Sequence, residues 1–453
     1  MRRNLQLRTT VSAAVMGAAV MGFAGVAAAQ EAPATVDDII VTAQKREQSL
    51  QDVPIVVTTL SQEILDGAGV QDIKDLQILT PGMTVTSTQS EASTTVRIRG
   101  AGTVGDNPGL ESSVGVVIDG VYRSRNSVGF GDLGEMARIE VLKGPQGTLF
   151  GKNTSAGVIN IITEAPSFTP EFNAELNVGN YGAMGASGSV TGPISDTLAF
   201  RLYASRRVRD GFMTIDTGDG PRPEVDDNNQ DFGTVRGQLL WLPSDNVSFR
   251  LIGDYDKIDE NCCIAANIQE NPAITAALRA ASGQARPIEA ADPFSYRVRN
   301  NIPSTNEIEN YGGSGQIDYD LGNMALTSIT AYRKVQADTN QDSDFTGADL
   351  IGENSQDLGI NTFTQELRVT SDFDGPINFL LGGYYFNEKI DQKNGLLFGD
   401  DFRPYGDALI QQASGGALSA APAATPNRVR RSSPSTEASA SLTSRNAVSA
   451  ALR

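Results

Sequence analysis

The chain has 453 residues, with 36 Lys and Arg against 54 Asp and Glu, no histidine and two cysteines. A net charge of -18 repels phosphate backbones, which argues against general nucleic-acid binding. Without histidine there is no Ser-His-Asp or Cys-His catalytic unit and no His-ligated metal, and two adjacent cysteines are too few for a zinc site. A hydrophobic content of 40% excludes a multi-span helical membrane protein, but it allows membrane strands that alternate polar and apolar residues.

Residues 1–29 have the pattern of a secretory signal peptide. Arg2, Arg3 and Arg8 precede an uncharged run that ends in three alanines, which is a small-residue cleavage pattern. The alternative is a membrane anchor, because the uncharged run approaches spanning length. The cleavage pattern favours the signal peptide, so we expect an exported protein.

Residues 30–50 form a polar segment with one short β-prone run, which consists of Ile39, Ile40, Val41, Thr42 and Ala43. An extended peptide of this kind can add as a strand to the edge of another protein's sheet. The alternative is an ordinary first strand of the domain that follows, and the run alone favours that alternative.

Residues 51–166 have the pattern of a small α+β domain. Helices are expected from Ser61 to the glycines at 67 and 69, and over 72–79 before Pro81 and Gly82. Short strands are expected at 95–100, 115–120, 138–144 and 157–162.

Glycines are dense in this domain, which raises the question of a phosphate loop. The run Gly144-Pro-Gln-Gly147 lacks the Gly-Lys-Ser/Thr ending, and we do not expect it to open a helix, so no nucleotide site is predicted. The glycines are instead expected at tight turns that need positive φ, namely at Gly100, Gly120, Gly144, Gly147 and Gly151.

Three motifs of this domain occur in an order that identifies a family. The run at 138–163, with Lys-Gly-Pro-Gln-Gly-Thr-Leu-Phe-Gly at its centre, and the upstream Val-Arg-Ile-Arg-Gly100 and Val-Val-Ile-Asp-Gly120 closely resemble the plug of TonB-dependent outer-membrane receptors. In that family the plug fills a 22-stranded barrel, and the run at 39–43 stands where the TonB box belongs. The resemblance therefore favours the docking-strand interpretation of residues 39–43.

The resemblance also implies that Arg99 and Lys143 face carboxylates on the barrel wall. Buried charges need such partners, whereas solvation in a wet lumen is the alternative. Lys143 stands where arginine is usual, so it keeps the charge but loses planar bidentate bonding.

From residue 171 onward, strands alternate apolar and polar residues. The run 171–178 has perfect period two, and in the run at 247–255 we expect Leu251 and Tyr255 to face lipid while Arg250 and Asp254 face the lumen. Short and long connections alternate, as periplasmic turns and extracellular loops do. We therefore expect an α+β plug followed, at 167–398, by the N-terminal part of an antiparallel transmembrane β-barrel, with about nine of its 22 strands. The nine expected strands are 171–178, 184–194, 198–207, 232–242, 247–256, 311–321, 324–333, 363–370 and 377–386.

The long connections are polar and acidic. Asp338, Asn340, Asp342 and Asp344 have part of an EF-hand spacing, but Ser343 replaces the required glycine, so a solvated loop is expected and no metal site is predicted.

Two further features lie in the barrel region. Cys262 and Cys263 lie in a long connection, where they can pair or stay free. Glu366, in a run that resembles a barrel strand of the family, is a lumen-facing carboxylate and a candidate partner for Arg99 or Lys143.

Residues 399–453 depart from the barrel pattern. From residue 411 the composition turns to Ala, Ser and Arg without aromatic residues, so we expect a tail that is disordered or frameshifted. At this strand density a 22-stranded receptor needs about 710 residues, so we expect less than half of a barrel.

The resemblance implies energised uptake of a bulky nutrient across the outer membrane of a Gram-negative bacterium, most typically of a ferric siderophore. The implied partners are TonB of the inner-membrane energy complex, outer-membrane lipid and the nutrient. Iron would be cargo, and no cofactor, enzymatic reaction or nucleic-acid partner is expected. The alternatives are an inactive truncated fragment, a receptor for cobalamin or carbohydrate, and a passive porin, which the plug would block.

Overall fold

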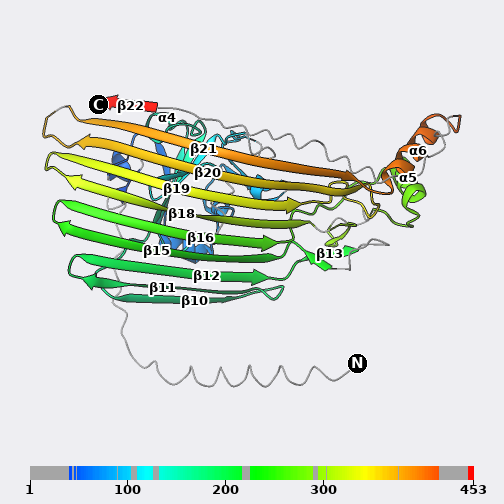
Figure 1. Ribbon diagram of the computed structural model, residues 1–453, viewed down its shortest axis with the longest axis horizontal. Coiled ribbons are helices and arrows are strands. Elements are labelled where there is room, and N and C mark those ends of the chain that lie inside the picture. Colours follow the sequence, from blue (N-terminus) through cyan, green and yellow to red (C-terminus); the bar gives the residue numbers. More distant parts are fainter. Residues whose placement is uncertain are drawn as a thin grey trace, which may run out of the picture.

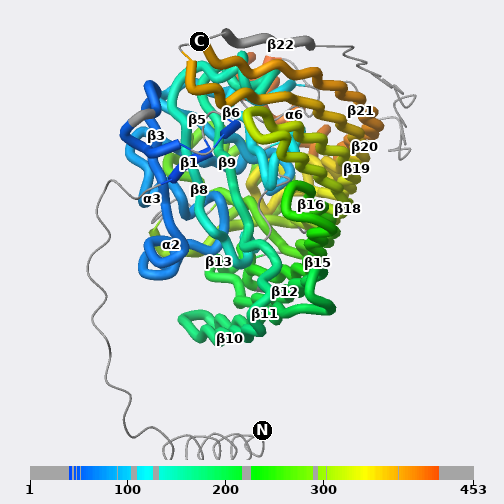
Figure 2. The backbone as a smooth tube through the Cα atoms, turned by 90° about the vertical axis from the view of Figure 1, so that its left-hand side faces the viewer, coloured from blue at the N-terminus to red at the C-terminus, as the bar shows by residue number. Residues whose placement is uncertain are grey.

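The computed structural model describes residues 40–42, 45–46, 48–88, 90–103, 110–125, 132–216, 225–288, 294–302, 304–375, 377–417 and 447–452. A long curved β-sheet, the wall sheet, runs from β10 to β22, and a small α+β domain lies on its concave side (Figure 2). The expected signal peptide and the docking-strand residues Ile39 and Ala43 lie outside the described residues. Among the helices described, none has the length and apolar character needed to cross a bilayer.

The small domain is built on a five-stranded sheet with the order β3-β8-β9-β6-β7, in which only β6 and β9 are parallel neighbours. Its core is apolar, and Leu76, Val96, Ile139 and Ile161 are completely buried. The elements are β1 (Ile40–Val41), β2 (Gln48–Ser49), η2 (Leu50–Asp52), β3 (Val56–Ser61), α2 (Gln62–Ala68), α3 (Leu76–Leu79), β4 (Met83–Thr86), η3 (Glu91–Ser93), β5 (Thr95–Ile98), β6 (Val114–Ile118), β7 (Val121–Arg123), β8 (Met136–Lys143), α4 (Gly147–Phe150) and β9 (Gly157–Thr163).

The second helix is shorter than expected. Asp72 Oδ1 accepts the backbone N–H groups of Lys74 and Asp75 at 2.7 and 3.1 Å, and Asp75 Oδ2 accepts that of Gln71 at 3.0 Å. These side-chain bonds hold a turn over residues 71–75, because aspartate competes with the helical backbone for the same donors. The helix therefore begins only at Leu76.

The glycine predictions are correct at four of five positions. Gly100, Gly120, Gly144 and Gly151 have φ values of 77, 78, 108 and 78°. Gly147 is different, because it begins the one-turn helix α4 and has no positive φ. The expectation that this run does not open a helix was therefore wrong.

The wall sheet is antiparallel throughout and contains the nine expected strands. Figure 1 shows them side by side in sequence order. Most strands extend further than expected; β19, for example, ends at Asn340 instead of residue 333. In these extensions the outer face becomes polar, and the apolar residues lie on the inner face, where Ile308, Val335 and Ile360 are buried in one cluster. The backbone ladder continues through them, as between Glu307 and Asp338. The strands are β10 (Glu171–Val178), β11 (Met184–Ser195), β12 (Leu198–Arg209), β15 (Gln230–Ser244), β16 (Val247–Glu260), β18 (Thr305–Asp320), β19 (Met324–Asn340), β20 (Ile351–Ser371), β21 (Phe379–Phe398) and, in addition, β22 (Ala447–Leu452).

The two faces of the wall sheet differ as the alternation predicts. Leu251 and Tyr255 on the outer face are 55% and 40% exposed. Arg250 lies on the inner face, where it contacts the small domain. Ile329 on β19 also points inward and packs against Val121 of the small domain.

The long connections gather at one end of the wall sheet (Figure 1). They contain α5 (Pro272–Ser282), α6 (Phe402–Ala413) and a three-stranded sheet of β13 (Met213–Asp216), β14 (Val225–Asp227) and β17 (Arg297–Arg299). The expectation of a disordered tail is wrong for α6, because Phe402 stacks on Phe398 at 4.2 Å and Tyr405 packs beside Leu278. These apolar residues precede the change of composition at residue 411, and residues 418–446 lie outside the described part.

Replacing Gly120 with alanine should destabilise the protein. Asp119 and Gly120 both have positive φ in the two-residue turn between β6 and β7, and an added Cβ would lie 2.7 Å from Ile329 Cδ1 of the wall. Backbone strain and the clash together should lower the free energy of unfolding by about 2 kcal/mol. Thermal unfolding in detergent measures this, with Gly147→Ala as the control because no atom lies within 4 Å of its added Cβ. Equal stability of the two variants would contradict the prediction.

Candidate functional site

The expected docking strand is bound to the small domain. β1 pairs antiparallel with β2, and Val41 is completely buried among Val53, Leu142 and Val158. Ile40, by contrast, is 45% exposed. Moving this strand out of the small domain must therefore break its pairing with β2 and extract Val41.

A buried carboxylate holds the end of this strand. The backbone N–H of Thr42 donates to Glu140 Oε1 at 2.8 Å, and Glu140 is 0% exposed. Glu140 also accepts hydrogen bonds from Arg138 Nε at 2.8 Å and from Asn160 Nδ2 at 3.1 Å. When the strand leaves, Glu140 keeps these two partners, so its buried charge is not left unpaired.

Lys45 links the docking segment to the wall sheet. Its Nζ lies 2.8 Å from Glu366 Oε2, and Glu366 Oε1 accepts from Arg368 Nη1 at 2.7 Å. Burial lowers the pKa of Lys45, and the charge of Glu366 opposes this effect. Glu366 faces inward as expected, but its predicted partners were wrong, because it pairs with Lys45 and Arg368.

Arg99 and Lys143 do not meet a wall carboxylate in the described part of the chain. Lys143 Nζ donates to the carbonyl oxygen of Pro81 at 3.0 Å, and burial together with the nearby charge of Arg99 lowers its pKa. Lys143 pairs with Val56 of β3, and Figure 2 shows β3 on the side of the small domain turned away from the wall strands. The two cations therefore cannot reach the carboxylates of these strands.

Other charges perform the joining role that was expected of Arg99 and Lys143. In the described residues, five ion pairs connect the small domain to the inner face of the wall sheet, and in three of them the wall supplies the arginine. The five pairs are Lys45–Glu366 at 2.8 Å, Asp119–Arg250 at 3.4 Å, Asp132–Arg207 at 2.7 Å, Arg125–Glu388 at 3.3 Å and Glu135–Arg201.

The sequence analysis predicted joining cations on the small domain alone, so the pairs in which the wall supplies the arginine were not predicted. The period-two alternation places Arg201, Arg207 and Arg250 on the inner face of the wall sheet. The wall side of these three ion pairs could therefore have been predicted from the sequence. Their partners on the small domain lie in turns and loops, so no periodicity marked them.

Asp132, like Glu135, accepts three hydrogen bonds at its contact. It accepts from Arg207 Nε at 2.7 Å, from the Tyr203 hydroxyl at 3.0 Å and from the backbone N–H of Gly134 at 2.8 Å. Beside it, Arg236 Nη1 donates to the carbonyl oxygen of Leu133 at 3.1 Å. The segment that begins at residue 132 is thus a main site of attachment between the small domain and the wall sheet.

A cavity of about 220 Å³ lies next to the docking segment. Lys45, Phe150 and Lys152 line it from the small domain, and Glu366 and Tyr384 line it from the wall. The Lys45–Glu366 pair therefore borders open space, which leaves room for the segment to move.

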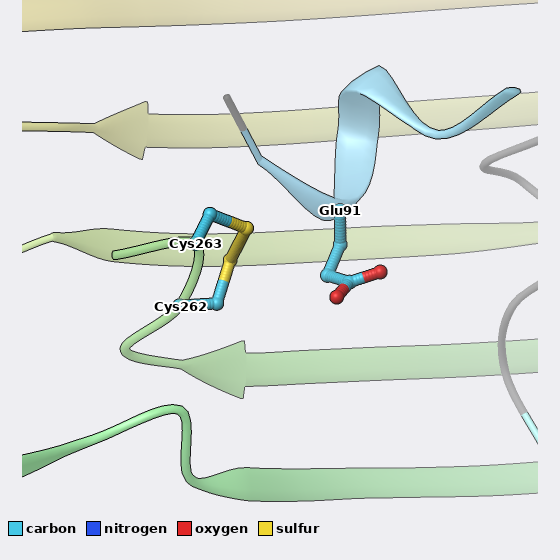
Figure 3. Close-up of side chains that lie close together, drawn as sticks. All are labelled: Glu91, Cys262 and Cys263. Carbon is cyan, nitrogen blue, oxygen red and sulfur yellow. A yellow bond between two sulfur atoms is a disulfide. The ribbon is translucent and has the colours of Figure 1, made fainter. Parts of the chain in front are cut away.

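Cys262 and Cys263 form a disulfide after the end of β16, next to Glu91 of η3, as Figure 3 shows. The backbone N–H of Cys263 donates to Asn228 Oδ1 at 3.0 Å, and its carbonyl accepts from Gln341 Nε2 at 3.3 Å. The backbone of Cys263 therefore connects the end of β16 to the residues that follow β14 and β19. In this oxidised state the two sulfurs are bonded to each other and offer no thiolate to a metal.

Replacing Asp132 with asparagine should loosen the small domain. The variant keeps the shape of the side chain but leaves Arg207 without its carboxylate, at a cost of about 3 kcal/mol. Urea unfolding in detergent measures the loss, together with the rate of proteolysis in the small domain. Asp391→Asn is the matched control, because the Lys389–Asp391 pair is more than half exposed and should contribute less than about 1 kcal/mol. Equal losses in both variants would contradict the assigned role.

Residues 49–158 match the family model of the TonB-dependent receptor plug domain. The pesticin receptor of Yersinia pestis is 30% identical over 233 residues, which cover 51% of this chain and 32% of that protein. The ferrienterobactin receptor of Escherichia coli is 34% identical over 214 residues, which cover 41% of this chain and 27% of that protein. The chain thus spans about a third or less of the length of these curated relatives.

The fold agrees with this match. The crystal structure of the ferric yersiniabactin uptake receptor from Yersinia pestis superposes with a TM-score of 0.63 at 20% identity, over 76% of this chain and 50% of that chain. The ferripyoverdine receptor of Pseudomonas aeruginosa gives 0.61 at 16% identity, over 78% of this chain and 45% of that chain. Residues 49–158 therefore match the plug domain of the TonB-dependent receptors, and the chain shares its fold, wall strands included, with these two receptors over about three quarters of its length.

Proposed function

We propose that this chain is part of an outer-membrane receptor that takes up a ferric siderophore with energy delivered through TonB. The observation that carries the proposal is the plug domain, seated by ion pairs on the inner face of the wall with its docking strand at the N-terminal side. Relatives that are 30% and 34% identical over 233 and 214 residues include receptors named for pesticin and ferrienterobactin. Iron is cargo in this proposal, and no residue is asked to perform covalent chemistry.

The outer face of the wall supports a location in the outer membrane. Leu202, Val235, Leu251 and Leu367 each expose half or more of their surface there, and Trp241 exposes 46%. Such a band of exposed apolar residues is costly in water and favourable in lipid. The long connections at one end of the strands would then face the outside, and the docking strand would face the periplasm.

Transport requires the docking strand to change partners. TonB would pair with β1 in place of β2, because an extended segment gains main-chain hydrogen bonds from a new strand neighbour. The transition breaks the Thr42–Glu140 and Lys45–Glu366 contacts, which are the contacts that bind the segment to the plug and to the wall. Pulling on the segment would then act on both at once and shift the plug.

Two alternatives are separable from this proposal. An inactive fragment would leave the edge strand β10, which is exposed along its length, without a neighbour in lipid. A closed barrel changes its gel migration on boiling in detergent, whereas an open sheet does not. A cobalamin receptor is the second alternative, because the vitamin B12 transporter of Vibrio vulnificus is 29% identical over 196 residues.

Replacing Ile40 with proline should abolish uptake while ligand binding persists. Proline removes the N–H that a new strand partner needs, and the exposed side chain of Ile40 limits the damage to packing. The readout is uptake of ⁵⁵Fe as the enterobactin, yersiniabactin and pyoverdine chelates, with labelled cyanocobalamin as a further arm, in a strain that lacks its other receptors. Ile40→Ala keeps the N–H and should transport normally. Uptake by the proline variant at the wild-type rate would refute the docking assignment.

Replacing Lys45 with methionine should release the docking segment. Without the Lys45–Glu366 pair, the backbone amides of β1 and β2 should exchange with deuterium about tenfold faster, because opening no longer breaks an ion pair. Hydrogen exchange followed by mass spectrometry measures this in detergent. Lys389→Met removes a charge from an exposed pair and should leave that exchange unchanged.

A further inference from the structure

Two cysteines that follow wall strand β16 and one carboxylate of the plug domain meet at the end of the wall sheet where the long connections gather (Figure 3). The ligand atoms of Cys262, Cys263 and Glu91 all lie within 4.8 Å of one another. Thiolate sulfur and carboxylate oxygen are both ligands of zinc. The sequence brings only the two cysteines together, and the fold adds a third ligand from a distant part of the chain.

The backbone of the cysteine pair is held by hydrogen bonds that do not involve sulfur. Cys263 donates its N–H to Asn228 Oδ1 at 3.0 Å, and its carbonyl oxygen accepts from Gln341 Nε2 at 3.3 Å. Cys262 is 7% exposed. Reduction of the disulfide breaks none of these contacts, so both thiols should stay beside Glu91.

Glu91 has one carboxylate oxygen to offer. Lys74 Nζ and the Ser87 hydroxyl donate to its Oε2 at 2.9 and 3.1 Å, and the Thr94 hydroxyl reaches the same atom at 3.5 Å. Its Oε1 accepts no hydrogen bond from the part of the chain that the structure describes. A carboxylate that is oriented through one oxygen can present the other to a metal.

The surroundings of Glu91 are acidic. Lys74 Nζ lies 2.9 Å from Glu91 Oε2 and 4.0 Å from Asp72 Oδ2. Burial lowers the pKa of this lysine, but the hydrogen bond to Glu91 and the charges of that residue, Asp72 and Glu260 raise it above its ordinary value. Arg209 offsets part of the charge of Glu260. Three carboxylates thus act on one ammonium group, and such a setting attracts a further cation.

We propose that the reduced pair Cys262 and Cys263 binds a zinc ion together with Glu91. A thiol of the glutathione class supplies the two electrons that open the disulfide and is itself oxidised to a disulfide, and zinc then displaces the two thiol protons. Ligand atoms around tetrahedral zinc lie about 3.5 to 3.8 Å apart, so small side-chain rotations complete the site. Zinc suits this mixed set of sulfur and oxygen, whereas copper(I) prefers sulfur.

The zinc ion would join two parts of the molecule that the disulfide does not. The disulfide lies within the connection between β16 and β18, whereas zinc would link this connection to η3 of the plug domain. Reduction in the presence of zinc should therefore restrain η3 on the wall. Three protein ligands leave the fourth position of zinc open to water. This inference does not rest on siderophore transport.

Zinc titration in competition with a chromophoric chelator tests the site on the full chain, purified in detergent without a polyhistidine tag. The reduced protein should bind one zinc ion per chain, and the oxidised protein should bind none. The chain has no histidine and no other cysteine, so competing sites are few. Cobalt(II) in place of zinc should give the sulfur-to-metal charge-transfer absorption of thiolate ligands, which identifies the ligands directly.

Variants separate the contributions of the ligands. Cys262→Ser, Cys263→Ser and Glu91→Gln should each weaken zinc binding at least about tenfold, because even the partners of metal ligands contribute 10- to 100-fold. The Glu91→Gln variant should keep the thiolate absorption with cobalt. Glu63→Gln removes an exposed carboxylate of α2 and should bind zinc as the wild type does.

Three outcomes would overturn the proposal. The first is the absence of saturable binding by the reduced protein up to about 0.1 mM zinc, which is far weaker than structural zinc sites bind. The second is equal binding by the reduced and the oxidised protein, which indicates adventitious zinc only. The third is wild-type affinity of Glu91→Gln, which removes the plug domain from the site. The first two comparisons use the wild-type chain, so they do not depend on the folding of a variant.

Discussion

The pairing of opposite charges between the plug domain and the inner face of the wall is the constraint on which this structure depends. Period two places arginines such as Arg201, Arg207 and Arg250 on that face, where they are largely removed from water. Each needs a carboxylate, and Glu135, Asp132 and Asp119 of the plug domain supply them. The wall and the plug domain therefore neutralise each other's buried charges, and removing either one leaves the charges of the other unpaired.

The proposed function requires the seated domain to move, and the same physics allows this. Polar contacts between two surfaces exchange for water more readily than a packed apolar core does, because the separated groups are hydrated. The docking segment shows the principle on a small scale. Glu140 keeps Arg138 and Asn160 when Thr42 leaves, and Lys45 borders a cavity. The segment is thus attached by polar contacts whose partners remain hydrogen-bonded or hydrated after it leaves.

The sequence predicted the architecture well and the site less well. Nine strands were predicted because a sheet with one face in lipid repeats every two residues. Their extensions were missed because the outer face becomes polar there and the apolar residues lie on the inner face. Asp72 and Asp75 shortened α3 through local bonds that the apolar spacing does not reveal. The charged partners were misassigned because Glu366 meets Lys45, a residue 321 positions away in the chain.

The sequence by itself determined the strand alternation, the turn glycines Gly100, Gly120, Gly144 and Gly151, and the resemblance to a plug, because these depend on neighbouring residues and on local backbone geometry. Only the tertiary structure decided that β1 is covered by the plug domain, which charges meet across the interface and that Asp342 is buried beside Asn301. Those outcomes depend on which distant segments share a region of space. Hydrogen bonding and charge neutralisation act between such segments without leaving a period in the sequence.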